Sequence, residues 1–201
     1  RMSGEMCTSL GNGIANLVIM YFVLTEAGCT HIFGVIEGDD GLFTFVGNLP
    51  TQAMFNTLGF DIKLEIHECL STASFCGLVF DLEDRVNVTD PRQVLINLGW
   101  VGRKYNFANR TTRMVLLRAK GYSLAFTYPR CPILSAVARY LLRITKSYDV
   151  RSYIHNTRNL AQWDRQKLLD AYAYGSTHGF CNDPIGDNTR DLVKRLYRID
   201  E

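Results

Sequence analysis

The first third of the chain has almost no positive charge. No lysine or arginine occurs between Arg1 and Lys63. Residues 1–87 hold 3 basic and 11 acidic side chains, which gives a net charge of −8. Acidic side chains that lie close together here have no basic neighbour in the sequence to offset their repulsion, so a divalent cation is the partner that would keep them ionised.

Negative charge is scarce in the next part of the chain. Residues 88–146 contain 11 lysines and arginines against the single acid Asp90, whereas residues 147–201 balance at 8 against 8. The net charge of residues 88–201 is therefore +10. A solvated helical face usually interleaves acids with its bases, so the segment 88–146 favours contact with a nucleic acid over a merely solvated surface.

Close cysteine pairs and long apolar runs are also missing. The six cysteines form no Cys-x-x-Cys pair, which favours reduced thiols in a cytosolic setting. A zinc site of His67, Cys69 and Cys76 stays an alternative, although structural zinc usually takes four closely paired ligands. The longest apolar run, residues 17–24, is shorter than the about 20 residues that cross a bilayer, and no signal peptide is visible. No transmembrane segment is predicted.

What the sequence does contain is a pair of adjacent carboxylates in a turn. Apolar, β-prone residues flank the segment Gly38-Asp39-Asp40-Gly41 on both sides within residues 32–45. Glycine and aspartate favour a tight chain reversal, so a β-hairpin with Asp39 and Asp40 at its tip is predicted. Carboxylate oxygens suit magnesium or manganese, which makes the tip a candidate metal site. A solvated turn is the alternative.

A second pattern lies upstream of the turn. Ser3 and Gly4 are followed after three residues by Thr8, and after three more by Asn12. A chance match to these four fixed positions is expected in about one chain of this length in a thousand. Each residue alone could be a helix cap, so it is the joint pattern, followed by the acidic turn, that favours a functional role.

The pattern at residues 3–12 and the acidic turn, in this order, resemble motifs B and C of the RNA-dependent RNA polymerases of positive-strand RNA viruses. The residues at positions 3–12 are most similar to those of tombusvirus-like and nodavirus-like enzymes. Residues 58–65 resemble motif D and residues 74–80 resemble motif E of the same family. Reverse transcriptases share the palm but usually carry an aromatic residue two positions before the aspartate pair, where this chain has Glu37. A reverse transcriptase-like enzyme and a non-enzymatic RNA-binding module remain alternatives.

The resemblance implies an α+β fold in two parts. Residues 1–87 would form the C-terminal part of a right-hand polymerase palm, an antiparallel sheet with helices, and residues 88–201 a mainly helical thumb. In the family, motif A and the fingers precede motif B, so the chain is expected to be a fragment that is inactive without them. The resemblance also places the enzyme in the host cytoplasm, in a membrane-associated replication complex attached through regions not present here.

The resemblance assigns a role to each matching residue. Asp39 and Asp40 would hold magnesium or manganese, with Asp39 as the principal ligand, and Lys63 would assist the leaving pyrophosphate, although a plain surface lysine is nearly as consistent. Template RNA, nascent RNA and ribonucleoside triphosphates would be the partners. The residues expected to bind the nucleotide are Ser3, Gly4, Thr8 and Asn12. Those expected to bind primer or RNA are Phe75, Cys76, Gly77, Arg103, Lys104, Arg113, Arg118 and Lys120, of which Phe75 could equally belong to the core.

Periodicity predicts the remaining elements. Residues 61–66 are expected to form a short strand, and residues 74–81 the outgoing arm of another hairpin. Gly11 and Gly13, inside the first helix, suggest close approach of another backbone or of RNA. Residues 91–96 suit the start of a helix. Helices are expected at residues 8–26, from near 50 to near 59, and at 111–122, 133–144, 160–174 and 189–197.

Overall fold

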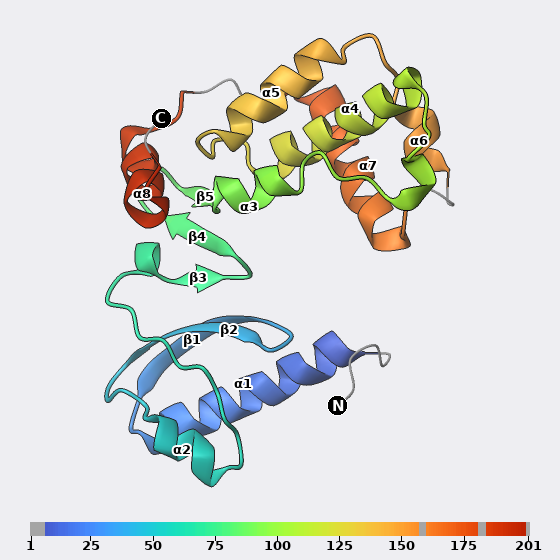
Figure 1. Cartoon of the computed structure of the whole chain (residues 1–201). Coiled ribbons are helices and arrows are strands. Elements are labelled where there is room, and N and C mark those ends of the chain that lie inside the picture. The colour runs from blue at the N-terminus through green and yellow to red at the C-terminus, as the bar shows by residue number, and fades with distance from the viewer. Residues whose placement is uncertain (1–6, 157–159, 181–183, 200–201) are drawn as a thin grey trace. The chain divides into compact units, whose positions relative to one another are not determined.

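The computed structural model describes residues 7–156, 160–180 and 184–199. It contains both helices and small antiparallel sheets, in the order that Figure 1 shows from the blue N-terminal part to the red C-terminal part. The chain divides into two compact units, Arg1–Phe80 and Asp81–Glu201. Ser3 and Gly4, two of the predicted nucleotide-binding residues, lie outside the described residues.

The first unit is built on one long helix and a hairpin. Helix α1 spans Thr8–Glu26, as predicted, and ends before Gly28, whose positive φ of 80° suits a helix terminus. Strands β1 (Thr30–Glu37) and β2 (Asp40–Val46) form the predicted antiparallel hairpin, which packs on α1. Helix α2 (Gln52–Thr57) is shorter than the predicted segment and is followed by the 3₁₀ turn η1 (Leu70–Thr72).

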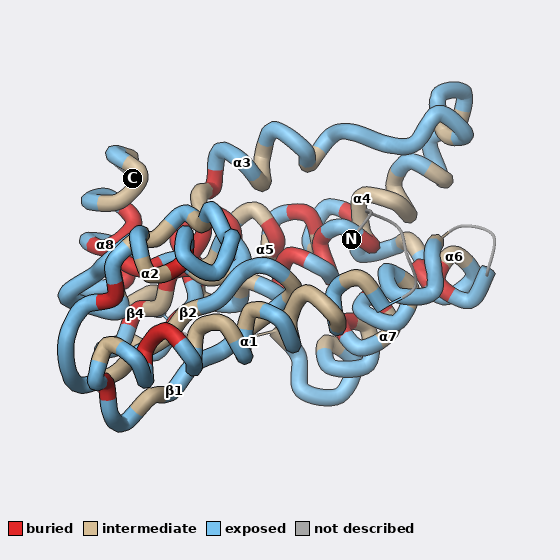
Figure 2. The backbone as a smooth tube through the Cα atoms, turned by 90° about the horizontal axis from the view of Figure 1, so that it is seen from below, coloured by how far each residue is buried: buried red, intermediate tan, exposed pale blue. Residues whose placement is uncertain are grey.

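The core of this unit is small and lies at one end of α1. Val23 and Leu24 near the end of α1, together with Phe55 of α2, are fully buried. Most of α1 and the hairpin is exposed or only partly covered, as the tan and pale blue tube in Figure 2 shows. Six large apolar side chains of α1 are exposed: Leu10, Ile14, Leu17, Val18, Tyr21 and Phe22.

The exposed apolar surface of α1 changes one expectation. The prediction of no transmembrane segment rested on an uninterrupted apolar run, but the whole 19-residue helix, polar residues included, is long and apolar enough to cross a membrane. Length and composition are the only basis for this finding, and helices of soluble proteins and signal sequences meet the same criterion. In the structure, α1 carries polar side chains that bond to the hairpin.

Two predictions on the following segment are wrong. Residues 61–66 form no strand; extended residues become a strand only when a neighbouring strand pairs with their backbone. Residues 74–81 are not one arm but a whole hairpin, with β3 (Ser74–Phe75) and β4 (Leu78–Asp81) joined by Cys76 and Gly77. Both loop residues have positive φ, 51° and 75°, which is typical of a type I′ turn.

The second unit is mainly helical, and its predicted helices are confirmed with small shifts at their ends. Strand β5 (Val86–Val88) completes a sheet of order β3-β4-β5. The side chain of Asp90 accepts a hydrogen bond from the Arg92 amide and so caps α3, and Asn109 caps α4 in the same way at 2.9 Å from the Thr112 amide. The helical elements are α3 (Pro91–Ile96), η2 (Arg103–Tyr105), α4 (Arg110–Thr127), α5 (Leu134–Ile144), α6 (Arg151–His155), α7 (Gln162–Thr177) and α8 (Asp187–Tyr197).

Helix α4 is the centre of this unit because both of its sides are covered. One apolar cluster joins it to α6 and α7 and consists of Ala119, Tyr122, Val150, Ile154, Leu168 and Ala171. The other joins it to α5 and consists of Leu124, Ala125, Ala138 and Leu141. At the crossing with α5, a Cβ on Gly121 would lie 3.2 Å from the Leu142 side chain, so the absence of a side chain permits the close approach.

The last helix is fixed by two aspartates that lie far from it in the sequence. The backbone N–H of Thr189 donates to Asp84 Oδ2 at 2.9 Å, and the Thr189 hydroxyl lies 2.6 Å from Asp81 Oδ2 and 2.9 Å from Asp84 Oδ2. These hydrogen bonds lower the pKa of Asp84. The N-cap residue Gly186 has no side chain, and a Cβ there would collide with the Asp84 carboxylate. Asp84 therefore caps α8 in place of a local residue.

This capping interaction explains where the two units meet in the sequence. The sequence suggested a boundary after residue 87, where the charge changes sign, whereas the compact units divide after Phe80. Asp81 and Asp84 belong with the second unit because their carboxylates bind α8. A contact across more than 100 residues of sequence leaves no trace in local composition.

We expect Thr189→Val to destabilise the second unit. Valine keeps the volume of threonine but leaves the buried Asp81 carboxylate without the hydroxyl, and an unsatisfied buried polar group costs about 1–3 kcal/mol. Urea denaturation followed by far-ultraviolet circular dichroism measures the loss. Thr127→Val, at an exposed position of α4, is the matched control. Equal stability of the two variants would contradict the capping role.

Candidate metal and nucleotide site at the hairpin tip

The two predicted metal ligands lie at a two-residue reversal of the chain. Glu37 pairs with Asp40 across the hairpin, so the loop consists of Gly38 and Asp39 alone. Gly38 has a φ of 60°, and a glycine with positive φ at the first loop position is typical of a type II′ turn. Both Asp39 and Asp40 are exposed. The turn therefore presents two adjacent carboxylates to solvent.

Helix α1 holds the turn in place through side chains at helical spacing. Asn16 Nδ2 donates to the Asp39 backbone oxygen at 2.9 Å, and Ser9 Oγ donates to Glu37 Oε1 at 3.2 Å. Between them, a Cβ on Gly13 would lie 3.6 Å from the Ile36 side chain and 3.8 Å from Gly38 N. The sequence predicted that another backbone or RNA would approach α1 closely at its glycines. At Gly13 this neighbour is the hairpin.

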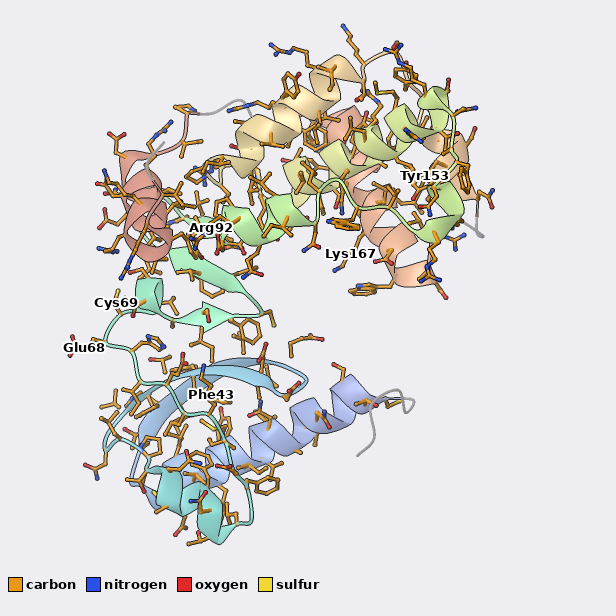
Figure 3. The ribbon with its side chains drawn as sticks, viewed as in Figure 1. Phe43, Glu68, Cys69, Arg92, Tyr153 and Lys167 are labelled. Atoms are coloured by element: carbon orange, nitrogen blue, oxygen red, sulfur yellow. The ribbon has the colours of Figure 1, made fainter. Side chains whose placement is uncertain are left out.

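Phe43 fixes the pairing of the two strands below the tip. Phe43, labelled on the hairpin in Figure 3, lies opposite Gly34 in the register. Its ring occupies the space that a side chain at position 34 would need. The same ring lies 2.9 Å from the Cβ position of Gly41. A one-residue slip would bring side chains against this ring, so the two glycines and Phe43 define the register that sets Asp40 at the tip.

The turn between β3 and β4 contains Cys76, whose side chain interacts with Asp40. Side chains alternate along a strand, so Asp40 points to the face opposite Gly41. The Cys76 thiol lies close enough to interact with Asp40 and Glu37; desolvation first, then the charge and hydrogen bond of Asp40, raise the pKa of Cys76. The structure therefore brings the predicted primer-binding turn, Phe75 to Gly77, to the predicted metal ligands.

The tip fits part of a metal centre. Carboxylate oxygens are hard donors of the kind that magnesium and manganese prefer, and both carboxylates face solvent. Within residues 7–156, 160–180 and 184–199, however, no group of three or more histidine, cysteine, aspartate or glutamate side chains is placed to hold a metal. Asp39 and Asp40 could supply two ligands, and further ligands would have to come from elsewhere.

The alternative zinc site is not formed. His67 Nδ1 lies 3.2 Å from Thr72 Oγ1, and Cys69 Sγ lies 2.9 Å from Ser71 Oγ. Cys76 lies instead beside Asp40. Each of the three candidate zinc ligands therefore contacts a different side chain. All three are described residues, and they form no group that could hold a metal ion.

The other predicted nucleotide-site residues are placed as follows. Asn12 and Thr8 are half-buried on the first two turns of α1, on the part of the helix that approaches the tip. A groove of about 730 Å³ runs between α1 and the end of β1, from Thr8 and Ser9 to Glu37 and Gly38, and Asn12 does not line it. The exposed ammonium of Lys63 pairs with Glu65, which raises the pKa of Lys63.

Three contributors to this site were not predicted. Ser9 and Asn16 anchor the turn, and Glu37 accepts the bond from Ser9. The sequence contains a signal for Ser9 and Asn16. Small or polar residues occupy the positions i, i+3, i+4 and i+7 of one helix face: Ser9, Asn12, Gly13 and Asn16. Small and polar residues on one helix face indicate contact with a backbone.

The predicted RNA-binding cations of the second unit have two kinds of environment. Arg118 points inward: it donates to the Leu142 backbone oxygen at 3.1 Å and to the Tyr122 hydroxyl at 3.2 Å, and so ties α4 to the segment that ends α5. Four others are exposed: Arg103, Lys104, Arg113 and Lys120. The basic segment is therefore partly structural and partly available to a ligand.

We expect Asn16→Ala to loosen the tip of the hairpin without unfolding it. The variant loses the bond to the Asp39 backbone, so amide hydrogen exchange should become faster at Gly38, Asp39 and Asp40. Asn48→Ala is the matched control, because Asn48 Nδ2 donates to the Ala27 backbone oxygen at 3.1 Å near the opposite end of the hairpin. Faster exchange at the tip in both variants, or in neither, would contradict the anchoring role.

Comparison with known proteins gives one informative similarity. The chain is 38% identical over 72 residues to the RNA-directed RNA polymerase of Greasy grouper nervous necrosis virus. The match covers 32% of this chain and 7% of that protein. No protein-family model matches the chain, and no solved structure shows significant similarity to it. Part of this chain is thus similar in sequence to a short part of a viral RNA-directed RNA polymerase.

Proposed function

We propose that this chain is the palm and thumb part of a viral RNA-directed RNA polymerase. The observation that carries the proposal is the hairpin tip: two adjacent carboxylates on a two-residue turn, anchored by the helix that bears Thr8 and Asn12. The similarity over 72 residues to a viral RNA-directed RNA polymerase supports the same assignment. Residues 1–87 are assigned to the palm and residues 88–201 to the thumb, a division that lies seven residues after the boundary between the two compact units.

The tip is assigned the metal-binding role in nucleotidyl transfer. Asp39 and Asp40 would hold magnesium or manganese, together with at least one ligand from outside the described residues. Such ions stabilise the negative charge that builds on the attacking and leaving oxygens when a 3′-hydroxyl displaces pyrophosphate. Asn16 contributes by fixing the Asp39 backbone while leaving both carboxylates available to the ion.

The start of α1 is assigned to the incoming nucleotide. Asn12 and Thr8, together with Ser3 and Gly4, would form hydrogen bonds with the ribose, whose 2′-hydroxyl distinguishes RNA precursors from DNA precursors. The groove beside Thr8 runs to Glu37 and Gly38, so a ligand in it would lie near the tip. Lys63, which pairs with Glu65, would have to leave this partner to reach a leaving pyrophosphate.

RNA is assigned to two further surfaces. The turn from Phe75 to Gly77 lies beside Asp40, which suits contact with the end of a growing strand. The exposed cations of the second unit would bind phosphates of template and product. Counterion release makes such contacts favourable and sensitive to salt.

We expect Asp39→Ala to abolish RNA synthesis and Asp40→Asn to reduce it less. Loss of the principal metal ligand removes several kcal/mol of charge stabilisation, so the rate should fall by about 1,000-fold or more. Ribonucleotide incorporation on an RNA template with magnesium, by a polymerase containing this chain, measures the effect. Glu68→Gln is the control, because Glu68 is an exposed acid of the same unit that lies outside the segments resembling the polymerase motifs.

The same assay separates the proposal from its alternatives. Equal residual activity of the Asp39 and Asp40 variants would contradict the ranking of the two ligands. RNA binding without any metal-dependent synthesis would indicate a non-enzymatic RNA-binding module instead.

We expect Asn12→Ala to weaken the preference for ribonucleotides over deoxyribonucleotides. A hydrogen bond to the 2′-hydroxyl contributes about 1 kcal/mol, so the ratio of the two kcat/KM values should fall about 5-fold. Asn56→Ala, on α2, is the control. Preferential use of deoxyribonucleotides by the unmodified enzyme would identify a reverse transcriptase-like activity.

A further inference from the structure

The second unit contains a groove that shares no residue with the candidate metal site at the hairpin tip. It has a volume of about 840 Å³ and lies between α4, α7 and the segment from Leu98 to Asn106. Its floor includes Ala119 and Leu168, which belong to the cluster that packs α4 against α7. A groove of this size matches pockets that hold one small organic ligand, which commonly measure about 300–1,000 Å³.

One side of the groove is aromatic. Trp100 lines it and keeps 77% of its surface exposed. Tyr105 and Tyr153 line it as well, with ring centroids 6.5 Å apart; Figure 3 labels Tyr153 on α6. Burial, followed by Tyr105 and Asp164, raises the pKa of Tyr153 and keeps its hydroxyl protonated. An exposed indole beside two tyrosine rings is a platform on which a planar base can stack.

The other side of the groove is cationic. Arg113 and Lys120 stand seven residues apart on α4 and therefore on the same face of the helix. Lys167, labelled in Figure 3, lines the groove from α7. All three side chains are exposed. The acid that lines the groove is Asp164, so positive charge prevails. Lys120 and Lys167 are 47 residues apart in the sequence, yet both line the same groove, where they could neutralise an anionic group.

We propose that this groove binds one unpaired nucleotide, with its base against Trp100 and its phosphate near Lys120 and Lys167. Stacking needs an exposed base face, which a base pair inside a duplex does not offer. The ligand is either a free nucleotide or a single nucleotide unit of an RNA strand, because both carry the same base and phosphate chemistry. The proposal rests on the assignment of RNA to the exposed cations of the second unit and makes it more specific, but it does not depend on Asp39 or Asp40.

Trp100 allows stacking to be measured directly. The chain has two tryptophans, so Trp163→Phe leaves Trp100 as the only indole. This variant is titrated with adenosine monophosphate, with a single-stranded adenosine octamer and with a blunt RNA duplex, in buffer without divalent metal. We expect saturable quenching of Trp100 fluorescence by the octamer, and no quenching by the duplex. Quenching by the monophosphate as well would identify a free nucleotide as a ligand.

The cations are tested on the same background. Lys120→Gln and Lys167→Gln should each weaken octamer binding by about 5-fold or more and lower the slope of log affinity against log salt by about 1. Lys146→Gln is the matched control, because Lys146 is an exposed lysine just beyond α5 that does not line the groove. Circular dichroism of each variant shows that it is folded.

Three results would overturn the proposal. The first is that neither adenosine monophosphate nor the octamer quenches Trp100 fluorescence, and the second is that the duplex quenches it as strongly as the octamer does. The third is that Lys146→Gln weakens octamer binding as much as Lys120→Gln and Lys167→Gln do. Failure here is distinguishable from failure of the polymerase assignment. Asp39→Ala should leave Trp100 quenching unchanged, because the two sites share no residue.

Discussion

The hydrogen bond from Asn16 to the Asp39 backbone is the interaction on which the candidate site depends. The neighbouring carboxylates of Asp39 and Asp40 repel each other. Residues 2–62 contain no lysine or arginine that could offset this repulsion. Helix α1 holds the turn without neutralising it, since it bonds the backbone oxygen of Asp39 and the side chain of Glu37 rather than either carboxylate of the pair. The turn is thereby fixed while Asp39 and Asp40 stay exposed to solvent and to a cation.

The positive charge of the second unit is divided between support and recognition. Arg118 joins α4 to the end of α5, and Arg130 donates to the backbone oxygens of Asp84 and Arg85 at 3.0 and 3.2 Å. These guanidiniums satisfy carbonyl groups that the fold would otherwise leave without a donor. Lys120 of the basic segment and Lys167 of α7 instead line an open groove beside Trp100. Arg113 lines the same groove and also donates to the Asn106 backbone oxygen at 3.3 Å. The basic segment therefore contains cations that support the fold and cations that face an open groove, and Arg113 does both.

Local patterns predicted the elements well and the contacts poorly. The long helix at 8–26 and the hairpin at Asp39 follow from periodicity and turn chemistry, which depend on near neighbours. The strand expected at 61–66 does not form, because a strand depends on a partner that the segment itself does not encode. The hairpin at 74–81 was read as one arm, since Cys76, a non-glycine residue with positive φ, gave no turn signal. The roles of Asp39, Asp40 and Asn12 stay predictions, whereas Ser9 and Asn16, whose side chains bond to the hairpin tip, were not predicted.

By itself the sequence determined the helices, the acidic turn, the separation of charge and the resemblance to a polymerase, because each is written in residues close together along the chain. Tertiary structure decided which side chains meet. In the folded chain, Asn16 bonds to the Asp39 backbone, and Cys76 interacts with Asp40. Asp84 caps α8, and Trp100 lines the same groove as Lys120 and Lys167. These contacts join residues up to 105 positions apart, and they form only when packing of apolar faces has brought the elements together.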